Sequence, residues 1–87
     1  MNLLRVERTI ASYHVSDKDI VNEINIDYVP FDKILSIIDP HEDDPLLYDG
    51  YVLSEDQFDL LNSLLEEKIL PNFEDFYYVL ECAGIYE

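Results

Sequence analysis

The first 28 residues contain two runs in which apolar and polar side chains alternate, the pattern of strands with one buried face. β-Branched and aromatic side chains dominate residues 4–14. In residues 20–28, Ile24, Ile26 and Tyr28 fall on one face of an extended chain. Polar residues 16–19 separate the runs, as in a turn. The pattern predicts a β-hairpin of residues 4–14 and 20–28 with one face in contact with water.

Two later stretches have the apolar spacing of helices. Pro30 suits the start of the first, residues 31–38, and the pair Asp39-Pro40 ends it because the residue before a proline avoids helical geometry. Ser54 begins the second, residues 55–68, and Gln57 completes a capping box with it. The apolar stripes are Phe31, Ile34, Leu35 and Ile38 in the first helix, and Phe58, Leu61, Leu64 and Leu65 in the second.

The remaining segments complete the predicted fold. Residues 39–50 contain two prolines and an apolar group at 46–48, which favours an ordered loop, and residues 51–53 can form a short strand. Residues 73–85 fit either a helix or a strand, and their aromatic and β-branched side chains favour the strand. We therefore predict a single α+β domain, residues 1–87, in which an antiparallel β-sheet carries two helices packed on one face, in the order ββα, loop, (β)αβ.

Charge is unevenly distributed along this domain. Twenty acidic and five basic side chains give a net charge of −15, and no Lys or Arg occurs between Lys33 and Lys68. Such a field repels nucleic acid and anionic membranes and attracts basic surfaces. No apolar run approaches the length of a membrane span, and charged residues interrupt the N-terminus too early for a signal peptide. We expect a cytoplasmic protein with a basic protein partner and no direct contact with nucleic acid or membrane.

The sequence contains few groups that could hold a metal. His14, His41 and Cys82 are widely separated and have no paired spacing, so we expect no metal and no other cofactor. Residues 39–50 are acidic enough for a calcium loop, but Asp44 and Gly50 stand where such a loop requires Gly and a bidentate Glu.

Catalytic patterns are equally sparse. Cys82 follows Glu81 and precedes no basic residue, so a small apolar filler is a better interpretation than a nucleophile. With glycine only at positions 50 and 84, no glycine-rich phosphate loop can be built. We predict that the protein is not an enzyme.

The acidic middle of the chain also contains tyrosines, which are enriched at binding hot spots. Carboxylates accept bidentate hydrogen bonds from arginine, so such a surface suits a basic partner. Alternatively, the tyrosines anchor a loop whose acids are merely solvated. On the first interpretation, the candidate partner-binding residues are Asp39, Glu42, Asp43, Asp44, Tyr48, Asp49, Tyr51 and Glu55.

Four segments carry a resemblance to small acidic bacterial proteins that look like immunity proteins of polymorphic toxins, including those of contact-dependent growth inhibition. The segments are Arg5-Val6-Glu7-Arg8, Asp43-Asp44-Pro45-Leu46-Leu47-Tyr48, Ser54-Glu55-Asp56-Gln57 and Tyr78-Val79-Leu80-Glu81-Cys82. The resemblance implies a protein that neutralises a cognate toxin domain, commonly a nuclease, in the cytosol. It supplies no site residues. The alternative hypotheses are an acidic nucleic-acid mimic that inhibits a defence protein, or an acidic adaptor subunit.

Overall fold

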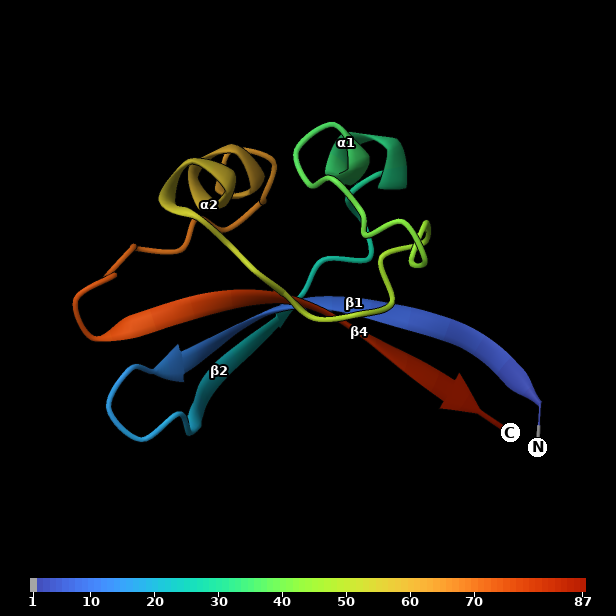
Figure 1. Ribbon diagram of the computed structural model, residues 1–87, viewed down its shortest axis with the longest axis horizontal. Coiled ribbons are helices and arrows are strands. Elements are labelled where there is room, and N and C mark those ends of the chain that lie inside the picture. Colours follow the sequence, from blue (N-terminus) through green and yellow to red (C-terminus); the bar gives the residue numbers. More distant parts are fainter. Residues whose placement is uncertain (1) are drawn as a thin grey trace.

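The computed structural model describes residues 2–87, and a four-stranded antiparallel sheet with the strand order β2-β1-β4-β3 organises them (Figure 1). The strands are β1 (Leu3–His14), β2 (Ile20–Asn25), β3 (Tyr51–Val52) and β4 (Phe76–Tyr86). The helices are α1 (Phe31–Leu35) and α2 (Glu55–Asn62), and both lie on one face of the sheet (Figure 1). The predicted α+β fold, with an antiparallel sheet and two helices on one face, is confirmed.

The two central strands come from opposite ends of the chain. β1 and β4 pair along their whole length, from Leu3 opposite Tyr86 to His14 opposite Phe76. The termini therefore lie side by side (Figure 1), and the Glu87 backbone N–H donates to the Asn2 carbonyl at 2.9 Å. The sequence of residues 73–85 fits either a helix or a strand. Because β1 provides a long partner strand, residues 76–86 form a strand.

The register aligns one buried residue from each strand. Ile24, Ile10, Leu80 and Tyr51 are neighbours across the four strands. All of them belong to the hydrophobic core or pack against it, so their row faces the helices. Since successive side chains alternate between faces, the next row, Glu23, Ala11, Val79 and Val52, faces away from the helices.

Both helices are shorter than predicted, although their apolar side chains are buried as expected. α1 ends at Leu35, yet the turn that follows still places Ile38 in the core at 1 % exposure. α2 begins with the predicted capping box between Ser54 and Gln57. It ends at Asn62, whose side chain donates to the Ile69 carbonyl and accepts from the Ile69 N–H, which ties the following segment to the helix. These side-chain contacts replace the helical hydrogen bonds that the apolar pattern predicted.

The hairpin is also confirmed, but β2 ends at Asn25 instead of residue 28. Ile26 is fully buried and its N–H still donates to the Arg8 carbonyl at 2.8 Å. The Asp27 side chain then accepts from the Arg8 N–H at 2.7 Å. A side chain therefore takes the place that the next residue of β2 would occupy, and the chain turns toward α1.

Phe58 is the contact that joins α2 to the sheet. The centre of its ring lies 4.4 Å from that of Tyr78 and 5.4 Å from that of Phe73, and the side chain is fully buried.

We expect Phe58→Ala to lower the free energy of unfolding by about 3–5 kcal/mol, because the cavity cannot close around a rigid aromatic pair. Urea unfolding followed by circular dichroism measures this loss. The control is Leu60→Ala on the exposed side of α2, which should change stability by about 0.5 kcal/mol or less. Equal losses in both variants would contradict this role for Phe58.

Candidate functional site

The acidic loop, residues 39–50, consists of two consecutive turns between α1 and β3. The Asp44 N–H donates to the His41 carbonyl at 2.9 Å, and the Leu47 N–H donates to the Asp44 carbonyl at 3.1 Å. Leu47 has a φ of 56° and is 1 % exposed, so its side chain fastens the loop to the core despite a backbone conformation that L-residues rarely adopt. The loop is therefore ordered, as its prolines predicted.

Asp44 is the hydrogen-bonding centre of the loop. Its side chain is 6 % exposed and accepts three hydrogen bonds, from the Tyr48 N–H at 2.8 Å, the Asp49 N–H at 2.9 Å and the Tyr51 hydroxyl at 2.6 Å. The Tyr51 hydroxyl in turn accepts from the His41 N–H at 3.1 Å. The Asp44 carboxylate thus binds the end of the loop and Tyr51, the first residue of β3. The Tyr51 hydroxyl binds the start of the loop at His41.

These contacts shift the pKa values of both side chains. Burial alone would raise the pKa of Asp44, but the hydrogen bonds from Tyr51, Asp49 and Tyr48 lower it on balance below its ordinary value of 3.8. Burial and the hydrogen bond to Asp44 raise the pKa of Tyr51. At neutral pH, Asp44 is therefore an ionised acceptor and Tyr51 a neutral donor.

Arg8 connects the acidic loop to the sheet from beneath. Its Nη2 donates to the Leu46 carbonyl at 2.6 Å, and its guanidinium lies 4.5 Å from the centre of the Phe31 ring. Its Nε is buried without a hydrogen-bond partner among residues 2–87. Within the described residues, this guanidinium bonds to a carbonyl and forms no ion pair with a carboxylate of the loop.

The structure separates the predicted binding residues into three groups. Asp44 and Tyr51 are buried and serve as internal anchors, so they cannot present their side chains to a partner, and we remove both from the candidate surface. Glu55 lies in the first turn of α2, where a negative charge suits the positive end of the helix. The residues that the acidic loop exposes together are Asp39, Glu42, Asp43, Tyr48 and Asp49, and we call these five the acidic loop surface.

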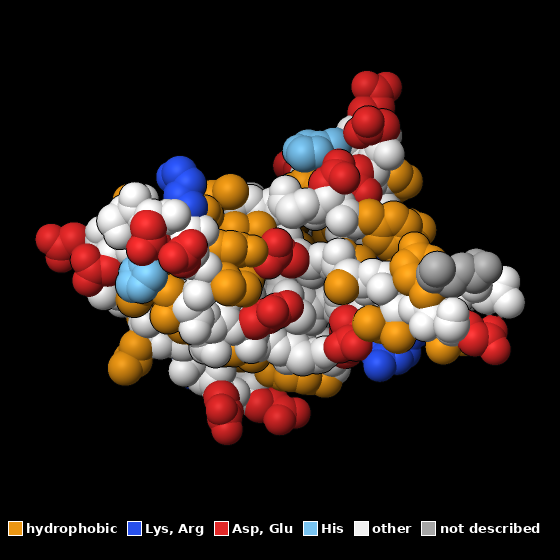
Figure 2. All heavy atoms as spheres, turned by 90° about the horizontal axis from the view of Figure 1, so that it is seen from below, with side chains coloured by type: hydrophobic (Ala, Val, Ile, Leu, Met, Phe, Trp, Pro, Cys, Tyr) orange, Lys and Arg blue, Asp and Glu red, His pale blue; other side chains and the backbone are white. Residues whose placement is uncertain are grey.

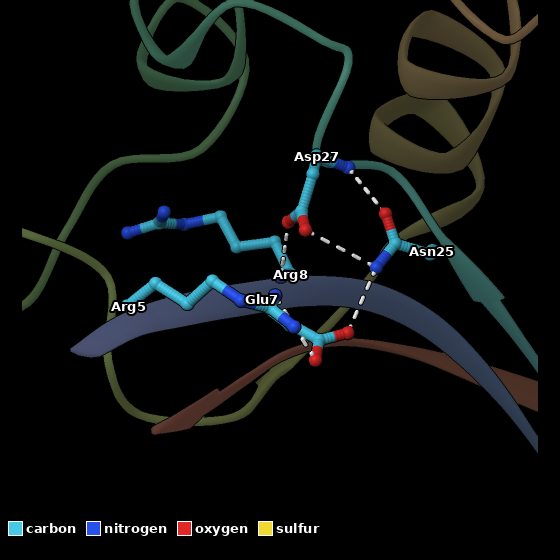
Figure 3. Close-up of polar contacts among 5 residues, drawn as sticks. All are labelled: Arg5, Glu7, Arg8, Asn25 and Asp27. Carbon is cyan, nitrogen blue, oxygen red and sulfur yellow. Dashed lines mark hydrogen bonds and ion pairs between the residues drawn. The ribbon is translucent and has the colours of Figure 1, made fainter. Parts of the chain in front are cut away.

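A second polar cluster lies at the edge of β1 where β2 ends (Figure 3). The Asn25 side chain donates to Glu7 at 3.1 Å and to Asp27 at 3.2 Å, and Arg5 forms an ion pair with Glu7 at 3.1 Å. The sequence did not predict this cluster, since Glu7 and Asn25 become neighbours only through strand pairing. Asp27 falls inside the predicted strand of residues 20–28, on its polar face, so no local pattern pointed to the cluster.

The sheet face away from the helices combines aromatic and acidic side chains. Figure 2 shows patches of hydrophobic side chains, the class that includes tyrosine, on this face, with carboxylates among and around them. Tyr13 stacks on Tyr77 with ring centres 5.3 Å apart and donates to Glu81 at 2.8 Å. The hydrogen bond to Glu81, together with burial, raises the pKa of Tyr13 to about 12. These side chains are engaged with one another, whereas most acids of the loop surface are not.

Further features bear on chemistry. Cys82 is half-buried, and burial raises the pKa of its thiol although Arg8 opposes the shift. Within the described part of the chain, no three His, Cys, Asp or Glu side chains are grouped so that they could hold a metal ion. None of the helices formed by residues 2–87 has the length and apolar character of a membrane span.

Asp44→Asn should lower the urea midpoint of unfolding at neutral pH, because the charged acceptor of three hydrogen bonds is lost. The pKa of Asp44 is lower in the folded state than its ordinary value of 3.8, so the stabilisation by the carboxylate is complete above that value. It is lost as pH falls through the folded pKa. We therefore expect the difference between the two proteins to narrow below about pH 4, as urea melts between about pH 7 and about pH 2.5 can measure.

The exposed neighbour Asp43 supplies the control. Asp43→Asn should leave the midpoint nearly unchanged at every pH, since its side chain makes no hydrogen bond among residues 2–87. A difference between Asp44→Asn and the unchanged protein that stayed constant down to the lowest pH would contradict the role assigned to the ionised carboxylate.

Comparison with known proteins identifies a family but no activity. No curated protein and no solved structure matches the chain. One family model matches residues 7–81, from the middle of β1 to the middle of β4, and so covers the sheet core, both helices and the acidic loop. The chain therefore belongs to the family described as "Domain of unknown function (DUF7683)".

Proposed function

We propose that the protein is a non-catalytic binding protein that blocks a basic protein partner through the acidic loop surface. The observation that carries the proposal is that the acids of the loop have two different roles. One buried acid, Asp44, holds the backbone, and four other acids remain exposed on it. A loop that is ordered before binding loses little conformational entropy in the complex.

Charges around this surface favour a basic partner. The closest approach to neutralisation within the loop is between His41 and Asp49, whose Nδ1 and Oδ2 atoms are 3.7 Å apart, with both side chains mostly exposed. Arg8 is occupied by the Leu46 carbonyl and the Phe31 ring. The carboxylates are thus available to Lys and Arg side chains of another protein, and their field accelerates encounter with it.

Apolar anchors accompany the acids. Leu46 and Tyr48 are 48 % and 49 % exposed, although both side chains are large. Side chains of this kind exclude water around ion pairs at an interface and so strengthen them. Acids and half-exposed apolar groups on an ordered loop are the composition expected of a surface that recognises a basic protein and holds it.

A toxin is the specific partner that we propose. The resemblance to immunity proteins suggests a cytoplasmic protein that covers the basic active-site cleft of a cognate toxin, commonly a nuclease. A carboxylate row can occupy a cleft built for a nucleic-acid backbone, because arginine forks fit carboxylate and phosphate alike. This hypothesis predicts that the neighbouring gene encodes the toxin domain.

The test begins with the tagged protein in the cells that naturally produce it. Affinity capture should recover one basic protein in a stoichiometric complex. With that partner purified, the double substitution Glu42→Gln/Asp43→Asn should weaken binding about tenfold, and added salt should slow association steeply. Surface plasmon resonance measures both effects.

Glu66→Gln/Glu67→Gln is the matched control, because it removes the same charge from two exposed side chains beyond α2. Its effect on affinity should be small. Equal losses in both double variants would mean that only the overall field matters, and capture of no basic protein would refute the proposed function itself.

A further inference from the structure

Among residues 2–87, the outer edge of β4 lacks a partner strand over about half the length of β4. β4 pairs with β1 at all positions along one side, but on its other side it pairs with β3 only at Val79 and Leu80. Residues 81–86 continue past β3 for about 20 Å at the usual rise per residue. In Figure 1 this part of β4 extends with the start of β1 beyond both helices.

Alternation along β4 identifies which backbone groups face outward. The Tyr78 carbonyl accepts from the Leu53 N–H on the β3 side, and Leu80 also faces β3. With the period of two of a strand, the N–H and C=O groups of Cys82, Gly84 and Tyr86 point to the same side. No segment within residues 2–87 forms backbone hydrogen bonds with them there.

At the opposite edge of the sheet, Arg8 of β1 has a side-chain partner where β2 ends. There the Asp27 carboxylate accepts from the Arg8 N–H, and Asn25 connects Asp27 to Glu7 (Figure 3). Side chains thus cover the point at which β2 leaves β1, a common protection of sheet edges against pairing with other chains. The outer edge of β4 has no such cover among the described residues.

A pocket lies beside the open edge, on the sheet face that carries the helices. It has a volume of about 210 Å³ and is lined by Leu3, Val6, Tyr48, Cys82, Gly84 and Tyr86. Its floor includes Gly84, which has no side chain, and Tyr48 brings the acidic loop surface to its rim. A strand added to β4 would direct every second side chain toward this face, so one apolar side chain could enter the pocket.

Charge decides what kind of segment fits. Tyr48 of the acidic loop surface lines the pocket and Glu81 begins the open edge, while the two arginines of this region, Arg5 and Arg8, bind Glu7 and the Leu46 carbonyl. An acidic segment, or a second copy of this chain with its charge of −15, would be repelled. An extended basic segment with a single apolar side chain matches both the charge and the pocket, because the basic side chains two residues before and after the apolar one point to the same face.

We propose that the protein binds an extended basic segment of its partner as an additional strand along residues 81–86 of β4. One apolar side chain of that segment occupies the pocket over Gly84, and its basic side chains contact the acidic loop surface. The inference rests on the proposed function in that the partner is basic, and it adds how the partner docks. Backbone pairing supplies affinity without dependence on sequence, while the pocket and the acids select the segment.

The probe is a capped peptide of about eight residues to match the edge, with one valine near its centre and lysine at the other positions. Amide exchange followed by NMR should show new protection at Cys82, Gly84 and Tyr86, with amides of β2 unchanged. A peptide with glutamate in place of lysine should give no protection. Glu42→Gln/Asp43→Asn should weaken binding of the lysine peptide, because the acids of the loop contribute.

Gly84→Leu fills the pocket and should weaken the peptide about tenfold. The nearest atoms to the added Cβ would be the side-chain ends of Tyr86 and Leu3, at 3.0 and 3.2 Å, and these can move. Ala83→Leu is the matched control, because it enlarges the next residue of β4 on the opposite face. Circular dichroism checks that both variants fold. The amide-exchange experiment on the unchanged protein does not depend on either variant.

Several results would overturn the inference. Protection of the same amides without peptide, rising with protein concentration, would assign the edge to a second copy. Equal protection by the glutamate peptide would show that the edge does not select a basic segment. Shifts confined to residues 39–49, sensitive to Glu42→Gln/Asp43→Asn and not to Gly84→Leu, would refute strand addition and leave the proposed function standing.

Discussion

The pairing of β1 with β4 is the constraint on which the other elements depend. Its eleven residue pairs join the two ends of the chain, so every segment between them is closed into one loop. β2 pairs only with β1, and β3 pairs only with β4. Because contacts so distant in sequence must form against the entropy of loop closure, folding of this domain should depend on the ends meeting. Both helices then cover one of the two faces of the sheet that this pairing organises.

The same pairing positions the acidic loop. Arg8 of β1 reaches under the loop to the Leu46 carbonyl, and Tyr51, the first residue of β3, is aligned with Leu80 of β4 while its hydroxyl bonds Asp44. The loop is thus attached to both central strands through buried polar contacts. A buried carboxylate is stable there because three donors converge on it. The exposed acids of the loop have no comparable structural task, which leaves them for recognition.

High charge and an open edge belong together physically. A net charge of −15 on 87 residues destabilises the compact state by self-repulsion, and it also discourages copies of the chain from pairing along an exposed strand. Binding of a basic partner reduces the self-repulsion. The charge that keeps copies of the chain apart attracts such a partner. Tyr48 lines the pocket beside Gly84, so the acidic loop surface and the edge of β4 form one continuous region. Charge would then bring the partner close, and strand pairing would hold it.

The sequence by itself determined the elements and their faces. Alternation at residues 4–14, the capping box at Ser54 and the stripe through Phe58 and Leu61 are local signals, and each appears in the structure where short-range physics places it. Tertiary structure alone decided what depends on distant neighbours. Residues 76–86 form a strand because they pair with β1. α2 ends at Asn62, whose side chain forms hydrogen bonds with the backbone of Ile69. Asp44 and Asp43 are adjacent acids of the same type, and no local pattern distinguishes them. Only the convergence of Tyr48, Asp49 and Tyr51 on one of the two makes Asp44 an anchor and leaves Asp43 exposed, since burial of a carboxylate depends on donors that the fold brings together.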